Sequence, residues 1–412
     1  MFEMLNSVQF PSGSGIQGAV FSVLGWLYNG IGSYGVAIII FTLLLRLVMT
    51  PLDFGTKYFT KRNAIRMKEI KPEEQALRET YADDPVGYQR AKQALYKRHG
   101  AGMGGFCLFT LLNLVIMILV FFSVFQALNG ISNYNVYRQF RRLEHIHAHH
   151  IAYNAGTLGY APPIRYIGND QWEPIAGDNI SFQEAINNEY NATRTSFIWV
   201  HNVWRPDTWA SRTLSWGQFR SATNRHGDWG DLQEAELNQV RDVYNEIFDR
   251  QDGVTQTGRG WNGMLLLILL AAGSTYLSML VNAKAMKTTK ATQDNKKEAE
   301  VGYSIRKVRN TTSDGKTPER LPQIDPASAT KMMKFIMPLI MVVFTMTTTA
   351  ALAIYITAGA FIMTGLSFGI NFLVELLIKH QEKRKKDKIG VDGDVITINP
   401  HAKYFKRKTG KQ

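Results

Sequence analysis

The sequence predicts an all-α integral membrane protein: a five-helix transmembrane bundle with a cytoplasmic helical hairpin and a large extracytoplasmic insertion. Two observations predict this fold class. Basic residues are concentrated in alternate segments between apolar runs, as in membrane proteins whose cytoplasmic loops are positively charged. The apolar runs each have about 20 residues, the length of a membrane span, and occupy 34–52, 104–128, 261–283, 335–356 and 358–378.

The distribution of the net charge of +13 predicts the topology. Residues 1–33 contain no Lys or Arg, whereas 53–103 contain eleven. Residues 129–260 combine twelve Arg with fifteen Asp or Glu, while 284–334 and 379–412 carry twelve and eleven basic residues. We therefore expect a multi-pass protein of the plasma membrane with its N-terminus outside and its C-terminus in the cytoplasm. Because membrane topology accounts for the basic segments, we expect no DNA partner.

Arg46 lies well inside the first predicted span, residues 34–52. A charge at that depth costs about 2.5–3.5 kcal/mol on the insertion scale. The long side chain could bend to the nearer interface, as surface cations of membrane proteins do. Alternatively, it faces a watery cavity inside the bundle and acts there. This stretch alone leaves both interpretations open.

The outer N-terminal segment, residues 1–33, has no basic region and no lipobox cysteine, so we expect no cleaved signal peptide. Its apolar part, 16–31, is too short to span easily. It predicts an amphipathic helix on the outer leaflet, with Trp26 and Tyr28 at headgroup depth. Pro51 is expected to end the first span.

The segment 53–103 predicts two helices joined by a turn. Asp84 has the position of an N-cap and Pro85 that of the first helical residue, while Gly100 ends the second helix. A solvated connector is the simplest interpretation, but two neighbouring spans could be joined by far fewer residues. The hairpin is therefore a candidate functional element.

The later spans also carry polar residues. Asn113 in the second span could join helices or line a cavity. The fourth and fifth spans are expected to form a hairpin with a tight turn near 357–359. The Thr residues between 345 and 349 can bond back to their own helix. Two basic cytoplasmic segments complete the chain, a loop at 284–334 and a tail at 379–412.

The extracytoplasmic insertion, 129–260, is long enough for a small domain, with a helix expected over 230–250. Four histidines lie between His145 and His150, and His145 and His149 would share a helix face. Metal binding and a polar surface patch both remain open, but without further ligands we assign no metal. Cys107 is the only cysteine, which excludes an intramolecular disulfide. No nucleotide-binding motif is complete, and we expect no cofactor.

Several motifs then occur in one order. The first span reads GVAIIIFTLLLRLVMTPL, with Thr42 one turn before Arg46. It is followed by YADDP at 81–85, LYKRHG at 95–100, GGFCL at 104–108, SFIW at 196–199, RPD at 205–207 and KMMKFIMP at 331–338. In this order and spacing the sequence resembles the YidC family of membrane protein insertases, in the five-span form of Gram-positive bacteria. The likeness covers about two thirds of the chain.

The sequence departs from the family pattern at several points. Phe109 replaces a proline, and Asn113 stands where a glutamine is usual. Thr349-Ala350-Ala351 occupies the usual P-A-G region of the fourth span. The insertion at 129–260 is far longer than the family's loop, and the resemblance assigns it no function.

The resemblance implies five helices around a hydrophilic groove that is open to the cytoplasm and lipid and closed outside. Arg46 would attract polar or acidic residues of a nascent segment, with Thr42 and Asn113 as polar neighbours in the groove. The implied function is a membrane protein insertase and chaperone without a catalytic step. Its partners would be nascent membrane proteins and lipids, with a ribosome at the basic tail and the Sec translocon as further candidates.

The runner-up is a small polytopic transporter or anion channel that uses Arg46 as a binding charge. Transporters usually show internal repeats or paired broken helices, and the sequence has neither. An intramembrane enzyme has less support, because no span holds a Ser–His pair, an aspartate pair or HExxH.

Overall fold

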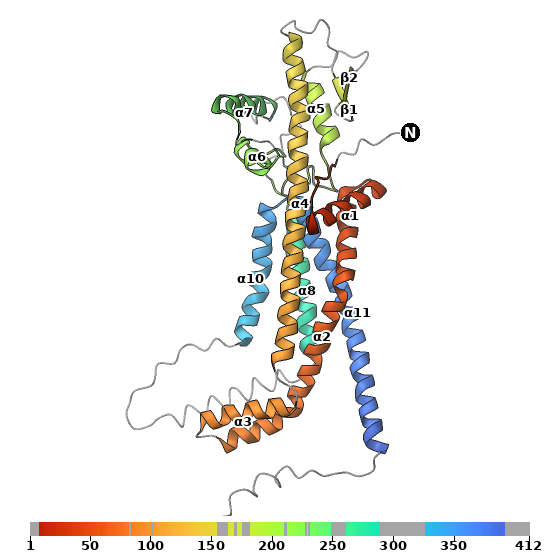
Figure 1. Cartoon of the computed structure of the whole chain (residues 1–412), viewed down its shortest axis with the longest axis vertical. Coiled ribbons are helices and arrows are strands. Elements are labelled where there is room, and N and C mark those ends of the chain that lie inside the picture. Colours follow the sequence, from red (N-terminus) through yellow and green to blue (C-terminus); the bar gives the residue numbers. More distant parts are fainter. Residues whose placement is uncertain are drawn as a thin grey trace, which may run out of the picture.

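The computed structural model describes residues 8–391 except 82–83, 100–102, 155–163, 169–170, 175–181, 210–211, 227–228, 230, 249–260 and 288–325. Figure 1 shows an elongated helical molecule in which the long helices run side by side. A smaller group of elements lies beyond one end of this bundle. Most of the predicted loop at 284–334, and the tail from 392 onward, lie outside the described residues.

The helices are α1 Gly15–Ile31, α2 Tyr34–Thr80, α3 Pro85–Arg98, α4 Met103–Asn154, α5 Phe182–Thr193, α6 Trp216–Thr223, α7 Glu234–Phe248, α8 Leu266–Lys287, α10 Pro326–Thr347 and α11 Ala350–Val391. The strands β1 Ile164–Gly168 and β2 Gln171–Pro174 pair antiparallel.

The predicted fold class, an all-α integral membrane protein, is confirmed. Among the described residues, three helices are long and apolar enough to cross a membrane: Tyr34–Met67, Phe109–Ala152 and Ala350–Gln381. Two shorter apolar stretches, Leu266–Leu280 and Pro338–Thr347, lie on α8 and α10. The predicted runs 34–52, 104–128 and 358–378 therefore each fall on one helix, most of 261–283 falls on α8, and 335–356 is divided between α10 and α11.

Pro51 was expected to end the first span, but it does not end the helix that contains this span. Pro51 lies inside α2, which continues to Thr80. A proline removes one helical hydrogen bond, but contacts beyond it hold this helix together. Below Pro51, the side chains of Phe54 and Tyr58 pack on Ile370 and neighbouring residues of α11. Tertiary packing therefore outweighs the local cost of the proline.

The predicted turn near 357–359 was also wrong, because the break between α10 and α11 falls at Thr348–Thr349. The first N–H groups of α11 find acceptors outside the helix. Ala350 N donates to Arg205 O at 2.8 Å, and Ala351 N donates to Val203 O at 3.1 Å. These distant carbonyls satisfy donors that a helix start leaves open, and so fix where α11 begins.

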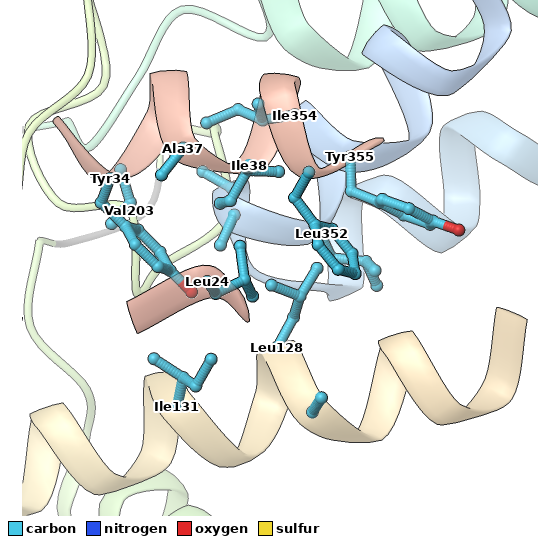
Figure 2. Close-up of a cluster of buried hydrophobic side chains, with 14 of the residues drawn as sticks. Leu24, Tyr34, Ala37, Ile38, Leu128, Ile131, Val203, Leu352, Ile354 and Tyr355 are labelled. Carbon is cyan, nitrogen blue, oxygen red and sulfur yellow. The ribbon is translucent and has the colours of Figure 1, made fainter. Parts of the chain in front are cut away.

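An apolar core joins the helices at the end of the bundle near α1. Figure 2 shows Leu24 of α1, Ile38 of α2, Leu128 of α4 and Leu352 of α11 pointing into one cluster. Tyr28 is also buried there, with 5% of its surface exposed, so its ring packs in the core of the bundle. Trp26, on the same helix, is 71% exposed.

The insertion, residues 129–260, folds around the upper half of α4. Its core consists of aromatic and aliphatic side chains from α4, α5, α6 and α7, including Phe140, Ile186, Phe219 and Ile247. The helix expected over 230–250 is α7, Glu234–Phe248.

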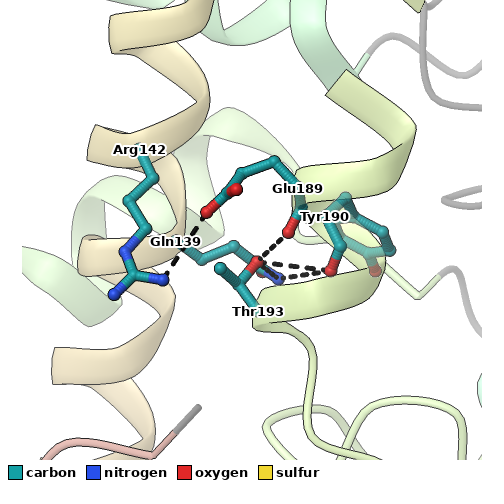
Figure 3. Close-up of polar contacts among 5 residues, drawn as sticks. All are labelled: Gln139, Arg142, Glu189, Tyr190 and Thr193. Carbon is teal, nitrogen blue, oxygen red and sulfur yellow. Dashed lines mark hydrogen bonds and ion pairs between the residues drawn. The ribbon is translucent and has the colours of Figure 1, made fainter. Parts of the chain in front are cut away.

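Polar contacts attach α5 to α4 within this region (Figure 3). Arg142 Nη1 lies 3.5 Å from Glu189 Oε1, and Gln139 Nε2 donates to Thr193 Oγ1 at 3.1 Å. Burial raises the pKa of the Glu189 carboxyl, and the neighbouring Arg142 lowers it. The Arg142 guanidinium also lies 3.8 Å from the centre of the Tyr166 ring, which ties the β-hairpin to α4.

The lower end of α2 and α3 form the predicted helical hairpin. Asp84 is its N-cap, because Asp84 Oδ1 accepts from Val86 N at 3.1 Å and Gly87 N at 2.9 Å. Glu74 of α2 accepts a hydrogen bond from the Tyr96 hydroxyl of α3 at 2.9 Å. Charged groups thus hold the two helices of the α2–α3 hairpin together.

Candidate functional site

Arg46 lies on the face of α2 that packs against α11. A Cβ atom placed on Gly359 of α11 would lie 3.2 Å from Arg46 Nη2 and 3.6 Å from Arg46 Nε. Gly359 therefore leaves room for the guanidinium group against the α11 backbone. Arg46 Nε is buried and has no hydrogen-bond partner in the described part of the chain. The side chain is thus a cation with unused donors inside the bundle.

Thr42, one turn before Arg46, is completely buried. Its methyl carbon would lie 3.5 Å from a Cβ on Gly359, so Thr42 and Arg46 meet the same point of α11. The Thr42 hydroxyl donates to Ile38 O at 2.6 Å. Its donor is therefore used within α2, and only the oxygen's acceptor capacity remains.

Asn113 lies on α4, the helix that faces α2 from the other side. Its Oδ1 atom is buried without a partner in the described chain, as is Oγ1 of Thr110, three residues earlier. Phe109 packs closely here, since a Cβ on Gly55 of α2 would lie 2.9 Å from the Phe109 ring. No hydrogen bond between described residues joins Asn113 to Arg46.

Sequence reasoning missed two charged residues on the Arg46 face of α2. Asp53 is buried, with 8% of its surface exposed, and Lys57 Nζ lies 3.4 Å from Ser367 O of α11. The Ser367 hydroxyl is itself buried without a partner in the described residues. The sequence contained a signal for this arrangement. Asp53 and Lys57 follow Arg46 by seven and eleven residues, a spacing that places all three on one face of a helix.

The α1 end of the bundle is closed by residues 195–208, which we call the cap segment. Asp207 in this segment is completely buried and meets the start of α8. Its carboxylate accepts from Met264 N at 2.8 Å, Leu267 N at 2.7 Å and Trp199 Nε1 at 3.1 Å. A carboxylate at a helix N-terminus is favourable, because unpaired N–H groups and the helix dipole point at it.

Asn262 completes the closure of this end. Its Nδ2 atom donates to Asn202 O at 2.9 Å and Pro206 O at 2.8 Å, and its Oδ1 accepts from Asn202 N at 2.8 Å. The cap segment also supplies the carbonyls that accept from Ala350 and Ala351 of α11. The SFIW and RPD motifs noted in the sequence are therefore the residues that connect α8 and α11.

The histidines between 145 and 150 do not converge. His145 stacks on Trp172 with ring centres 4.5 Å apart, whereas His147 Nε2 lies 2.9 Å from Glu246 Oε2 of α7. Among the described residues, no group of three or more His, Cys, Asp or Glu side chains could hold a metal ion.

Comparison with known proteins finds a partial likeness to one family. Residues 26–167 match the family model described as 60Kd inner membrane protein. The chain is 41% identical over 88 residues to "Membrane protein insertase YidC" of Granulibacter bethesdensis, which is 21% of this chain and 14% of that protein. Over this region the chain is similar to the YidC family of membrane protein insertases.

Other YidC insertases show the same partial likeness. That of Acidiphilium cryptum is 44% identical over 89 residues, 22% of this chain and 14% of the relative. That of Helicobacter pylori strain 26695 is 35% identical over 89 residues, 22% of this chain and 16% of the relative. The match to these YidC proteins thus spans about one seventh of their length. No solved structure matches the chain.

Proposed function

We propose that this protein is a membrane protein insertase and chaperone that moves nascent membrane proteins into the bilayer through a hydrophilic intramembrane groove. The observation that carries the proposal is Arg46: a cation with an unused donor, half-way along a membrane helix, lying against the backbone of α11 at Gly359. The three relatives described above are named as membrane protein insertases, which supports the same function.

The polar atoms around Arg46 support a groove. Thr110, Asn113 and Ser367 each present a buried oxygen or hydroxyl without a partner in the described chain. These groups lie on α4 and α11, two helices that contact α2. Hydration of such a groove removes much of the desolvation cost of the arginine. Thr42 and Asn113 then serve as its polar neighbours.

The physical step is the transfer of a short polar tail. Arg46 attracts an acidic or polar residue of the nascent segment, so less of its polar surface has to cross hydrocarbon. The apolar part of the substrate then moves sideways into lipid, driven by about 25 cal/mol for each Å² of apolar surface removed from water. The membrane potential assists an acidic tail that moves outward. This sequence of events needs no nucleotide or catalytic group.

The proposed orientation places the N-terminus and the cap segment outside and the α2–α3 hairpin in the cytoplasm. The cap segment then closes the groove toward the outside, through the hydrogen bonds of Asp207 and Asn262. The hairpin receives substrate, and the basic tail at 379–412 meets the phosphate-rich surface of a ribosome. The Sec translocon is a further proposed partner.

Insertion into liposomes tests this function. The substrate is a single-span protein with an acidic outer tail, and protease protection measures its insertion. We expect Arg46→Lys to retain most activity, because the positive charge remains, and Arg46→Ala to lose at least about tenfold. Arg62→Ala, which removes an exposed arginine lower on α2, is the matched control.

Equal insertion by wild type, Arg46→Lys and Arg46→Ala would contradict the groove mechanism. Arg46 would then be a snorkelling anchor. The alternative of a transporter or anion channel would appear in the same vesicles as Arg46-dependent flux of a small anion without any protein substrate.

A further inference from the structure

Three charged residues of alternating sign share one face of α2. Asp53 follows Arg46 by seven residues and Lys57 by eleven, which places them about two and three turns further along the helix. At about 100° per residue, all three point within about 20° of the Arg46 direction. The order along the helix is therefore positive, negative, positive.

This face is turned toward α11. Arg46 meets α11 at Gly359, and the Lys57 ammonium donates to Ser367 O at 3.4 Å. Asp53 lies between these two contacts and is 8% exposed. Within the described residues, no ion pair or hydrogen bond engages the Asp53 carboxylate, although Arg46 and Lys57 both act on it electrostatically.

A buried carboxylate costs free energy unless it is paired. Asp53 therefore destabilises the fold, which argues against a purely structural role for this residue. Asp53 also lies one turn before Lys57, which contacts Ser367 O, and two turns after Arg46, whose Nε has no partner among the described residues. Its negative charge therefore acts on whatever enters the polar interior around Arg46. Two unit charges about 10 Å apart at an effective dielectric constant of about 20 change an equilibrium by roughly tenfold.

We propose that Asp53 determines the charge specificity of the groove. Resting on the proposed insertase function, the inference is that Arg46 favours acidic tails while Asp53 admits substrates whose tail carries a basic residue. A basic side chain is held at Asp53 before it must pass Arg46. Asp53 repels an acidic side chain, and this repulsion offsets part of the attraction between that side chain and Arg46. The substrate class thus extends to tails of both signs.

Two single-span substrates that differ only in one tail residue, Glu or Lys, test this inference. The quantity measured is the ratio of acidic-tail to basic-tail insertion into liposomes. We expect Asp53→Asn to raise this ratio by about tenfold and Arg46→Ala to lower it. Asp53→Glu retains the charge and should keep the wild-type ratio. Glu69→Gln, an exposed acid on the same helix, is the matched control.

A second uncharged substitution at Asp53 keeps the test valid if Asp53→Asn does not fold. In Asp53→Thr the hydroxyl can bond back to its own helix, as the hydroxyls of Thr42, Thr50 and Thr56 do. It should shift the ratio as Asp53→Asn does. An unchanged ratio in a folded neutral variant would overturn the inference and leave Asp53 as a structural neighbour of Lys57. If wild type inserts neither substrate, the proposed insertase function fails instead.

Discussion

Two polar regions of this protein differ in how completely their hydrogen bonds are made. In the cap segment, Asp207 accepts three hydrogen bonds, and Asn262 engages both its oxygen and its nitrogen. In the middle of the bundle, Arg46 Nε, Asn113 Oδ1 and the Ser367 hydroxyl have no partner within the described chain. Both regions are buried, so exposure to solvent does not account for the difference.

The contrast indicates two different roles for buried polar groups. The bonded side chains of Asp207 and Asn262 stabilise one arrangement at one end of the bundle, although the Thr195 hydroxyl of the cap segment is buried without a partner among the described residues. Unsatisfied groups are costly to the fold, and in the proposed groove a substrate would bind them. The following predictions test this contrast by comparing stability with insertion.

The largest effect is expected from Asp207→Ala. It leaves the amides of Met264 and Leu267 and the indole of Trp199 without their acceptor, which should lower the free energy of unfolding by about 4 kcal/mol. Unfolding in detergent micelles, followed by circular dichroism, measures the change. Asp242→Ala removes an exposed carboxylate and should stay within about 0.5 kcal/mol of wild type. Similar stability of both variants would show that the cap segment does not hold the helix ends.

Two asparagines provide a matched pair for the next prediction. Asn262→Leu breaks a bonded amide and should destabilise the protein by about 2–3 kcal/mol. Asn113→Leu replaces an amide whose oxygen has no partner, so stability should be unchanged or slightly higher. Insertion should fall in Asn113→Leu even though the protein is stable. A clear loss of stability in Asn113→Leu would mean that its amide is structural, and the contrast would fail.

The smallest effect is expected from Gly359→Ala. The added methyl group would lie 3.2 Å from Arg46 Nη2, so the flexible guanidinium has to shift by a few tenths of an ångström. Alanine favours the helix, so stability should change by less than about 1 kcal/mol. Insertion should fall, but less than in Arg46→Ala. Gly365→Ala, where a methyl group meets open space on the same helix, is the control, and an equal response of both would exclude a role for Gly359.

Much of the fold could be predicted because the signals are local. Apolar runs of membrane length mark the helices, and Asp84-Pro85 is a sequence signature of a helix start that the structure bears out. The break between α10 and α11 could not be predicted in this way. It depends on carbonyls of Val203 and Arg205, which are more than a hundred residues away in the sequence.

The candidate site was predictable in part. Arg46 stood out because a charge is rare in an apolar run, but Asp53 and Lys57 followed Pro51, where the first span was expected to end. Once α2 is known to continue, helical spacing places them on the Arg46 face. The roles of Thr42 and Asn113 in substrate contact stay predictions, since their position in the bundle does not test them.

The length of α4 has a mechanical consequence. It is a single helix of 52 residues, about 78 Å long, that starts beside the α2–α3 hairpin and ends within the insertion region (Figure 1). A stiff rod of this kind acts as a lever. Tilting it by about 5° at one end moves the other end by about 7 Å. A protein that binds the insertion region on one side of the bilayer and tilts α4 would therefore move Thr110 and Asn113 without contacting them.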